Sequence, residues 1–178
     1  MSIKSLVVLL CVTAVFLCTA DATITVNDCH GGNSAIRLTN FNVENGYIPL
    51  AGGQRDISGT VSVNVGTSQV TQVQVKVEYA KAAVSFLSIN LCDRAELSEY
   101  CSGSGRTLSC SQFATLMGGT GLCSGSGLFQ NHNFDFNVRP TIPSTTTLKL
   151  SGSVSAKAVF RVGGQQVGCM TISIPVHN

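Results

Sequence analysis

Apolar and polar residues alternate with a period of two along three stretches of the chain, residues 57–65, 72–79 and 148–160. Successive side chains of a β-strand point to opposite faces, so this pattern predicts strands with one buried and one solvated face. Residues 167–176 predict a further strand. The pair Gly163 and Gly164 before it is typical of a two-residue hairpin turn.

Weaker alternation at residues 35–41, 82–89 and 134–138 brings the expected number of strands to seven or eight. Short strands separated by regular turn signals are typical of a two-sheet β-sandwich, so we expect an all-β, immunoglobulin-like fold. Residues 93–122 differ, because residues 94–97 and 112–117 favour short helical turns. We interpret this segment as an excursion from the sheets, held by cysteines.

The first 22 residues have the pattern of a secretory signal peptide. Lys4 precedes an apolar run of 13 residues, 6–18, and the small-residue site Ala20-Asp21-Ala22 follows it. A membrane-spanning helix needs roughly 20 apolar residues, so a membrane anchor is the weaker interpretation. We expect residues 1–22 to be the signal and residues 23–178 a single domain. The destination is then extracellular, or the lysosomal lumen by way of the secretory pathway.

Six cysteines remain after the signal peptide, at positions 29, 92, 101, 110, 123 and 169. An even number in an oxidising compartment predicts three disulfides, although the sequence permits 15 connectivities. Pairing of close neighbours would join Cys92 with Cys101 and Cys110 with Cys123. Cys29 and Cys169 would then tie the two ends of the domain together.

The charge and the motifs argue against several classes of protein. The net charge is +2 and charged residues make up 11% of the chain, without a basic stripe, so nucleic acid is not an expected partner. The histidines His30, His132 and His177 form no H-E-x-x-H, and no G-x-S-x-G occurs. We therefore expect no enzyme, no metal and no cofactor.

The order of several short segments resembles the MD-2-related lipid-recognition (ML) domain family. These segments are Val26-Asn27-Asp28-Cys29, Ile48-Pro49-Leu50 before a glycine turn, the alternating valine strands, and the closing run 163–169, Gly-Gly-Gln-Gln-Val-Gly-Cys. The resemblance covers nearly all of the mature chain. Its cysteine layout is most similar to that of the GM2 ganglioside activator. It departs from that pattern in lacking an additional central disulfide and any tryptophan.

The resemblance implies a sandwich whose sheets splay apart at one end around an apolar cavity for a lipid. It implies the disulfides Cys29–Cys169, Cys92–Cys101 and Cys110–Cys123. It also implies a lipid ligand, transient contact with a membrane surface, and possible presentation of the lipid to a hydrolase or receptor.

Two groups of apolar residues are candidates for contact with lipid. The cavity candidates come from the inward faces of strands: Val75, Val77, Phe86, Leu87, Ile89, Phe134, Phe136, Leu150, Val154, Phe160 and Ile172. The membrane-contact candidates come from the cysteine-bearing loops: Leu116, Met117, Leu122, Leu128 and Phe129. The plain alternatives are an ordinary sandwich core for the first group and packing beneath a disulfide for the second.

The sequence therefore predicts a secreted lipid-binding protein that carries or presents a sphingolipid, phospholipid or sterol. The alternative is a secreted immunoglobulin-like module with a packed core, which recognises a protein or a microbial surface.

Overall fold

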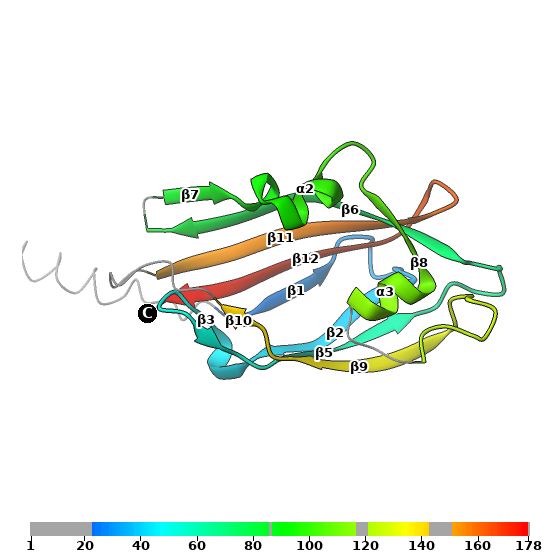
Figure 1. Cartoon of the computed structure of the whole chain (residues 1–178), viewed down its shortest axis with the longest axis horizontal. Helices are drawn as coiled ribbons and strands as arrows, with labels where there is room; N and C mark the ends of the chain where they lie inside the picture. The colour runs from blue at the N-terminus through cyan, green and yellow to red at the C-terminus, as the bar shows by residue number, and fades with distance from the viewer. Residues whose placement is uncertain (1–22, 86, 117–120, 143–150, 178) are drawn as a thin grey trace, which may run out of the picture.

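The computed structural model describes residues 23–85, 87–116, 121–142 and 151–177. The predicted signal peptide lies outside these residues. Most of the described chain forms antiparallel strands in two facing sheets, so the fold is an all-β, immunoglobulin-like sandwich (Figure 1). No helix in the described ranges is long and apolar enough to cross a membrane.

The larger sheet contains seven strands. Its main path runs β1-β12-β11-β6-β7, while β3 pairs with β12 and β8 pairs with β6. The bounds are β1 Thr25–Asp28, β3 Ile48–Pro49, β6 Gln72–Val84, β7 Leu87–Asn90, β8 Arg106–Ser109, β11 Ser151–Val162 and β12 Gln165–His177.

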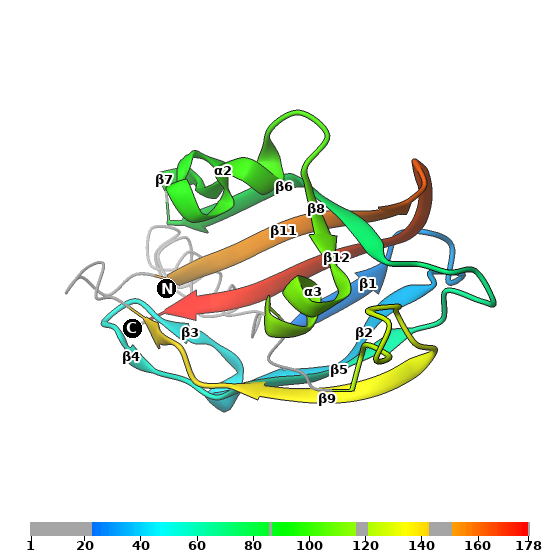
Figure 2. The same ribbon diagram turned by 45° about the vertical axis from the view of Figure 1, so that its right-hand side comes forward.

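The smaller sheet has the order β2-β5-β9, with β2 at Ile36–Val43, β5 at Ile57–Val63 and β9 at His132–Val138. A two-stranded ribbon of β4, Gly53–Gln54, and β10, Thr141–Ile142, lies at one end of the sandwich (Figure 2). The helical turns are η1 Glu44–Gly46, η2 Leu91–Asp93, α2 Ala95–Cys101 and α3 Cys110–Leu116.

Strands β11 and β12 form the hairpin that the glycine pair predicts. Val162 pairs with Gln165, which leaves Gly163 and Gly164 as the two-residue loop. Their φ angles are 56° and 82°, the positive values that a type I′ turn requires at both central positions. The backbone twist of a type I′ turn matches the twist of the two strands that it joins, here β11 and β12.

The hydrophobic core is concentrated toward the end of the sandwich that holds this hairpin turn. Fully buried Val61, Val73 and Leu108 come from β5, β6 and β8. Phe113 of α3 makes edge-on contacts with Phe129 and Phe160, with ring centroids 5.8 and 6.4 Å apart. Helix α3 therefore fills the gap between the sheets at this end.

The three disulfides are Cys29–Cys169, Cys92–Cys101 and Cys110–Cys123, the pairing that the resemblance implies. The first joins the end of β1 to β12 across 140 residues. The second joins η2 to α2. Lys76 Nζ of β6 donates hydrogen bonds to the carbonyl of Cys101, the last residue of α2, and to the carbonyl of Gly103 just after it. Lys76 thus attaches this part of the cysteine-bearing excursion to the larger sheet.

The structure corrects several expected strand boundaries. Residues 72–79 and 82–84 belong to one continuous strand, β6, which ends at Val84. Val84 pairs with Leu87 of β7, so the expected strand 82–89 is divided between two antiparallel strands. The consecutive strands β5 and β6 belong to different sheets. Strands β1, β3, β4, β8 and β10 have no period-two pattern long enough to be recognised, since each spans two to four residues.

Removal of the long disulfide, by C29A/C169A, should lower the free energy of unfolding more than removal of the short one, by C92A/C101A. A bridge that closes a loop of over 100 residues restricts the unfolded chain by about 5 kcal/mol, and one across 9 residues by less than about 3 kcal/mol. Urea unfolding monitored by circular dichroism measures both. Equal losses would show that the long bridge does not act mainly on the unfolded state.

Candidate functional site

The inner face of the larger sheet follows from strand register. Phe160 and Val75 are opposite each other and belong to the core, so residues in step with them face the smaller sheet. Directly opposed residues share a face, and alternate residues return to it. The inner face therefore includes Val77, Ala80, Ala82 and Val84 on β6, Gly152, Val154, Ala156 and Ala158 on β11, and Met170, Ile172, Ile174 and Val176 on β12.

Part of this inner face is not fully covered. β11 is the central strand of the main path, with β12 on one side and β6 on the other. Nevertheless Val154, Ala156 and Ala158 are only half-buried. Neighbouring strands shield the flanks of a central strand, so residual exposure on its inner face means that the opposite sheet does not pack closely against it.

Small side chains account for much of this space. Ala80, Ala82, Ala156 and Ala158 occupy adjoining positions on β6 and β11, with Gly152 at the end. At the other end of the same strands, Val75 and Phe160 are 7% and 5% exposed. Along β11 the inner face thus changes from the buried Phe160 at the hairpin end to half-buried Ala158, Ala156 and Val154. The flanking strands are more closely packed there, since their inner-face residues Ala80, Val84, Ile174 and Val176 are buried.

A pocket of about 270 Å³ opens between the sheets on the side where β1 faces β2. Its apolar wall consists of Val26, Ile36, Leu38 and Met170. Met170 pairs with Ala158, so the pocket borders the half-buried part of the inner face. Its volume is near the lower end of ligand pockets, which occupy roughly 300–1,000 Å³.

Asp28 forms the polar boundary of this pocket. Its carboxylate accepts hydrogen bonds from Ser34 Oγ at 2.7 Å and the His30 backbone N–H at 2.7 Å, and Arg37 Nε lies 3.8 Å away. Burial by itself would raise the pKa of Asp28, but the hydrogen bonds from Ser34 and His30, with the charge of Arg37, lower the pKa below its usual value of 3.8. Ser34 Oγ also accepts the Cys169 N–H, which links Asp28 to β12.

Exposed large apolar side chains in the described ranges lie on three elements. Leu87 and Ile89 are 51% and 44% exposed on β7, Val138 is 37% exposed on β9, and Leu116 is 55% exposed at the end of α3. Leu87 and Ile89 are opposite Val84 and Ala82, so they face the smaller sheet. Val138 is opposite Ile57, which packs against the core, and so faces the larger sheet.

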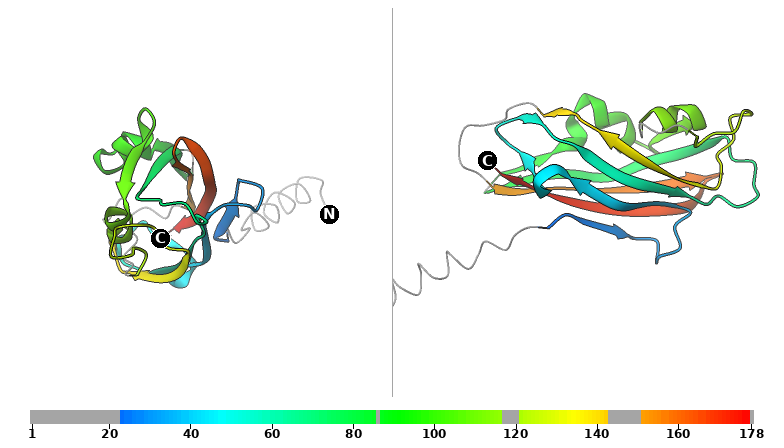
Figure 3. Two further views of the ribbon diagram at one scale, coloured as in Figure 1. Left: turned by 90° about the vertical axis from the view of Figure 1, so that its right-hand side faces the viewer. Right: turned by 90° about the horizontal axis from the view of Figure 1, so that it is seen from below.

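These residues border the side of the sandwich opposite the β1–β2 pocket. β1 and β12 contact β2 on one side, so β7 and β9 are the edge strands of the other (Figure 3). α3 lies between the sheets on that side, nearer the hairpin end (Figure 2). We call Leu87, Ile89, Val138 and Leu116 the apolar rim.

The predicted cavity residues separate into three groups. Val75, Phe134, Phe136 and Phe160 are buried in the packed core, whereas Val77, Val154 and Ile172 lie on the half-buried inner face. Leu87 and Ile89 are exposed, because β7 extends beyond the three strands of the smaller sheet, so they border the interior and do not line it deeply. Phe86 and Leu150 lie outside the described residues.

The predicted membrane-contact residues also need correction. Leu122 and Phe129 are 0% and 5% exposed, because the Cys110–Cys123 loop folds them into the core beside Phe113. Leu128 is half-buried and Leu116 is exposed. Met117 lies outside the described residues. For Leu122 and Phe129 the alternative, packing beneath their own disulfide, is the correct one.

Sequence patterns did not single out the small inner residues Ala80, Ala82, Ala156 and Ala158. These alanines do occupy apolar positions of the alternating pattern, and their side chains are unusually small. Small side chains alone do not tell whether the space beside them is a hollow or is closely packed. Among the described residues, no three His, Cys, Asp or Glu side chains lie close enough together to hold a metal ion.

The lowered pKa of Asp28 predicts acid sensitivity. The ionised carboxylate stabilises the folded state fully above about pH 4, the unfolded pKa, and this contribution is lost as the pH falls through the lower folded pKa. The difference in free energy of unfolding between wild type and Asp28→Asn should therefore shrink as the pH falls from 5 to 2. Urea titrations across that range measure it. A difference independent of pH would contradict this role.

Known proteins resemble this chain in structure more than in sequence. No family model and no curated protein matches the chain. The chain is similar to the crystal structure of a Niemann-Pick type C2 protein from the Japanese carpenter ant, with 11% sequence identity and a TM-score of 0.39. The match covers 86% of this chain and 98% of that one. A likeness of this extent leaves the function to be argued from the residues of the sandwich itself.

Proposed function

We propose that this chain is a secreted lipid-binding protein of the lipid-recognition family, which holds a lipid between its two sheets. The observation that supports the proposal is the half-buried inner face of the central strand β11, at Val154, Ala156 and Ala158. An apolar face in the middle of a sandwich is normally closed by the opposite sheet. A lipid chain would complete the packing that the smaller sheet leaves unfinished.

The energetics favour an apolar ligand. Transfer of a lipid chain out of water is favourable by about 0.8 kcal/mol for each CH₂ group that becomes buried. The inner face offers no charged group over the stretch from Val77 to Val84 on β6 and from Gly152 to Ala158 on β11. A chain lying there gains this free energy without desolvating a charge.

The pocket between β1 and β2 and the apolar rim give this interior two accessible sides. The pocket is about 270 Å³, enough for part of a ligand, and its wall residue Met170 adjoins the half-buried inner face. The rim residues Leu87 and Ile89 continue that face to the sheet edge. We propose the rim as the place where a lipid enters from a membrane.

Three disulfides and the signal-like N-terminus support passage through the secretory pathway, to the extracellular space or the lysosome. Delivery of the lipid to a hydrolase or receptor is compatible with the same site. Phospholipid, sphingolipid and sterol all satisfy an apolar interior.

The direct test is native mass spectrometry of protein secreted from eukaryotic cells, followed by organic extraction. A stoichiometric lipid that travels with the protein would support the proposal and name the lipid class. Protein that carries no lipid, and that neither binds nor transfers fluorescent lipids, would favour the packed interaction module.

Ala156→Phe distinguishes a hollow from a packed core. If the space beside Ala156 holds lipid, the phenyl ring of the variant should fit into that space with little loss of stability. Lipid occupancy should then fall severalfold, because the ring takes the place of the lipid. The control Val61→Phe changes a fully buried residue and should destabilise by about 1–3 kcal/mol or more, because packed cores resist enlargement. Thermal unfolding and native mass spectrometry measure both variants. Destabilisation of Ala156→Phe as large as that of the control would refute the hollow.

The double variant L87S/I89S tests the apolar rim. Both side chains are about half exposed, so their replacement should change stability little. Lipid transfer between vesicles should slow severalfold, because less apolar surface is available to contact the membrane. The exposed, disulfide-adjacent Ser102→Ala serves as a control that should leave transfer unchanged. Transfer at the wild-type rate in L87S/I89S would place the entry elsewhere.

A further inference from the structure

Incompletely buried positions on the inner face of the larger sheet form a diagonal band. Met170 of β12 is opposite Ala158 of β11. Val154 of β11 is opposite Ala82 of β6, which is opposite Ile89 of β7. The band consists of Met170 and Ile172 on β12, Ala158, Ala156 and Val154 on β11, Ala82 on β6 and Ile89 on β7, all half-buried except the exposed Ile89. Two further half-buried positions, Val77 and Gly152, adjoin it. The band crosses the sheet from one side of the sandwich to the other.

The band is narrow at its middle. On β12, Ile174 lies beside Val154, and on β6, Ala80 lies beside Ala156. Ile174 and Ala80 are 8% and 3% exposed, so the inner face is closed on both flanks of the band. Adjacent strands are about 4.8 Å apart, and the band is two strands wide at these two rows. We call this part the neck.

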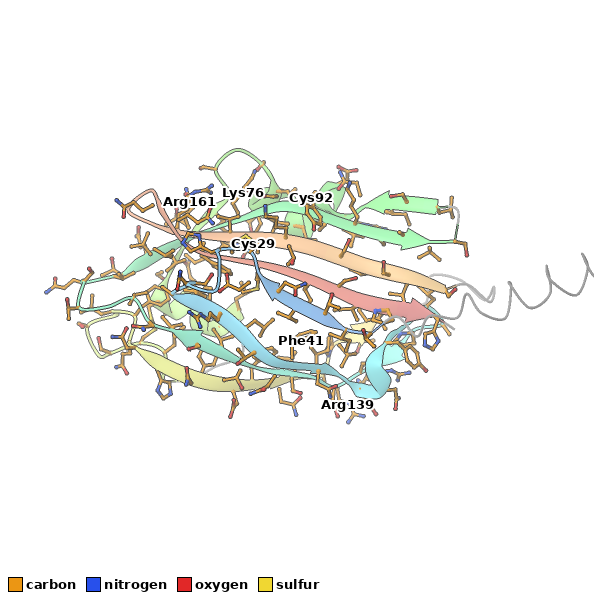
Figure 4. All side chains as sticks on the ribbon, turned by 180° about the vertical axis from the view of Figure 1, so that it is seen from behind. Cys29, Phe41, Lys76, Cys92, Arg139 and Arg161 are labelled. Atoms are coloured by element: carbon orange, nitrogen blue, oxygen red, sulfur yellow. A yellow bond between two sulfur atoms is a disulfide. The ribbon has the colours of Figure 1, made fainter. Side chains whose placement is uncertain are left out.

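The smaller sheet has a matching row of incompletely buried apolar side chains. Leu38 and Phe41 of β2 and Ile57 of β5 are half-buried and pack against the core. In Figure 4, Phe41 lies between β2 and the larger sheet. Leu38 lines the pocket between β1 and β2, whereas Val138 of β9 belongs to the apolar rim. Both sheets therefore leave apolar surface uncovered along a course between the same two sides.

The two ends of the band coincide with the two accessible sides of the interior. Met170 and Val26 line the pocket between β1 and β2, and Val26 is opposite Ile172. Ile89, at the other end, belongs to the apolar rim. No residue of the band or of the matching row carries a charge. A ligand that follows this course is therefore apolar over its buried length.

The length of the band corresponds to a long acyl chain. From β12 to β7 it crosses three strand intervals, about 14 Å, and from Ala158 to Val154 it advances by four residues, about 13 Å. The diagonal distance is then about 20 Å. Three bonds of an extended peptide chain span at most about 3.6 Å, so each bond of an extended hydrocarbon adds about 1.2 Å. A chain of about 16–18 carbons spans the band.

The width of the neck suits one chain. Non-bonded carbon atoms approach to about 3.5–4.0 Å, so an extended chain needs a strip about as wide as the interval between two strands. A second chain beside the first would have to displace Ile174 or Ala80. The fused rings of a sterol are wider than a single chain and cannot bend around these residues.

We infer that the ligand is a lipid with one acyl chain of about 16–18 carbons, which lies along the diagonal band, and that Ile174 and Ala80 exclude a second chain. This inference rests on the proposed lipid-binding function. It assigns the ligand to single-chain lipids, the fatty acids and lysophospholipids, in place of two-chain lipids and sterols.

The test is native mass spectrometry of the full mature chain with mixtures of lysophosphatidylcholines whose chains range from about 10 to about 22 carbons. One lipid should bind per protein. Each CH₂ group that becomes buried should tighten binding by about fourfold, and the affinity should level off at about 16–18 carbons, where the chain fills the band. Dipalmitoyl phosphatidylcholine and cholesterol should bind severalfold more weakly than the palmitoyl lysophospholipid.

Two variants test the position of the chain. Val154→Phe blocks the band near its middle and should shorten the preferred chain to roughly half its length. Ile174→Ala widens the neck and should increase the share of dipalmitoyl phosphatidylcholine severalfold. Ser155→Phe is the matched control, because it adds the same ring to the opposite face of β11 and should leave the preferred chain length unchanged. Thermal unfolding of each variant checks that the fold is retained.

The outcomes separate the two proposals. If wild type binds dipalmitoyl phosphatidylcholine or cholesterol as tightly as the single-chain lipids, or if the affinity shows no limit with chain length, the single-chain assignment is wrong and lipid binding stands. If wild type binds none of these lipids, lipid binding itself is wrong. Palmitic acid forms a further arm: its preference over the palmitoyl lysophospholipid, or the reverse, would support the assignment and identify the source of the chain.

Discussion

The arrangement of the sandwich depends on the junction of its two sheets at the hairpin end. The Ala35 backbone N–H donates to the Val167 carbonyl at 2.6 Å, which joins the smaller sheet to β12 directly. Gly168 makes this approach possible, because a Cβ at that position would lie 2.9 Å from the Ile36 carbonyl oxygen. The Cys29–Cys169 bridge lies beside the same contact and keeps β1 attached to it.

Because the sheets are joined at that end, their separation elsewhere depends on side-chain size. Phenylalanines 113, 129, 134, 136 and 160 fill the space near the junction. The alanines of β11 do not fill it further along, and the inner face of that central strand stays half-buried. A closely packed core and a half-buried inner face thus coexist along β11, separated by a change in residue volume.

Much of this fold was predictable from local patterns. The period-two runs in β5, β6, β11 and β12 and the glycine pair between the last two indicate strands and a hairpin without tertiary information. The membership of β5 and β6 in opposite sheets was not predictable, because alternation specifies a buried face and not the sheet that covers it. Short strands such as β3 and β4 exist through pairing with distant partners, so their own sequence carries little signal.

The candidate site was less accessible to prediction for a physical reason. Leu122 and Phe129 occur among glycines and serines, a composition that favours an exposed loop, yet the Cys110–Cys123 bridge draws both into the core. Arg55 lies over the ring of Tyr47, and Tyr47 stacks on His177, a residue 130 positions away in the sequence. Neither contact is encoded in local spacing.

The edge of β6 that faces away from β11 is arranged in a way that bears on aggregation. β8 pairs with its first four residues and β7 with its last four, while α2 packs against the stretch between them and Lys76 fastens that helix in place. Long exposed strand edges recruit strands from other molecules, and short edges or covering helices prevent this. By dividing one 13-residue edge into two four-residue strands and a disulfide-fixed helix, the chain protects itself against edge-to-edge aggregation.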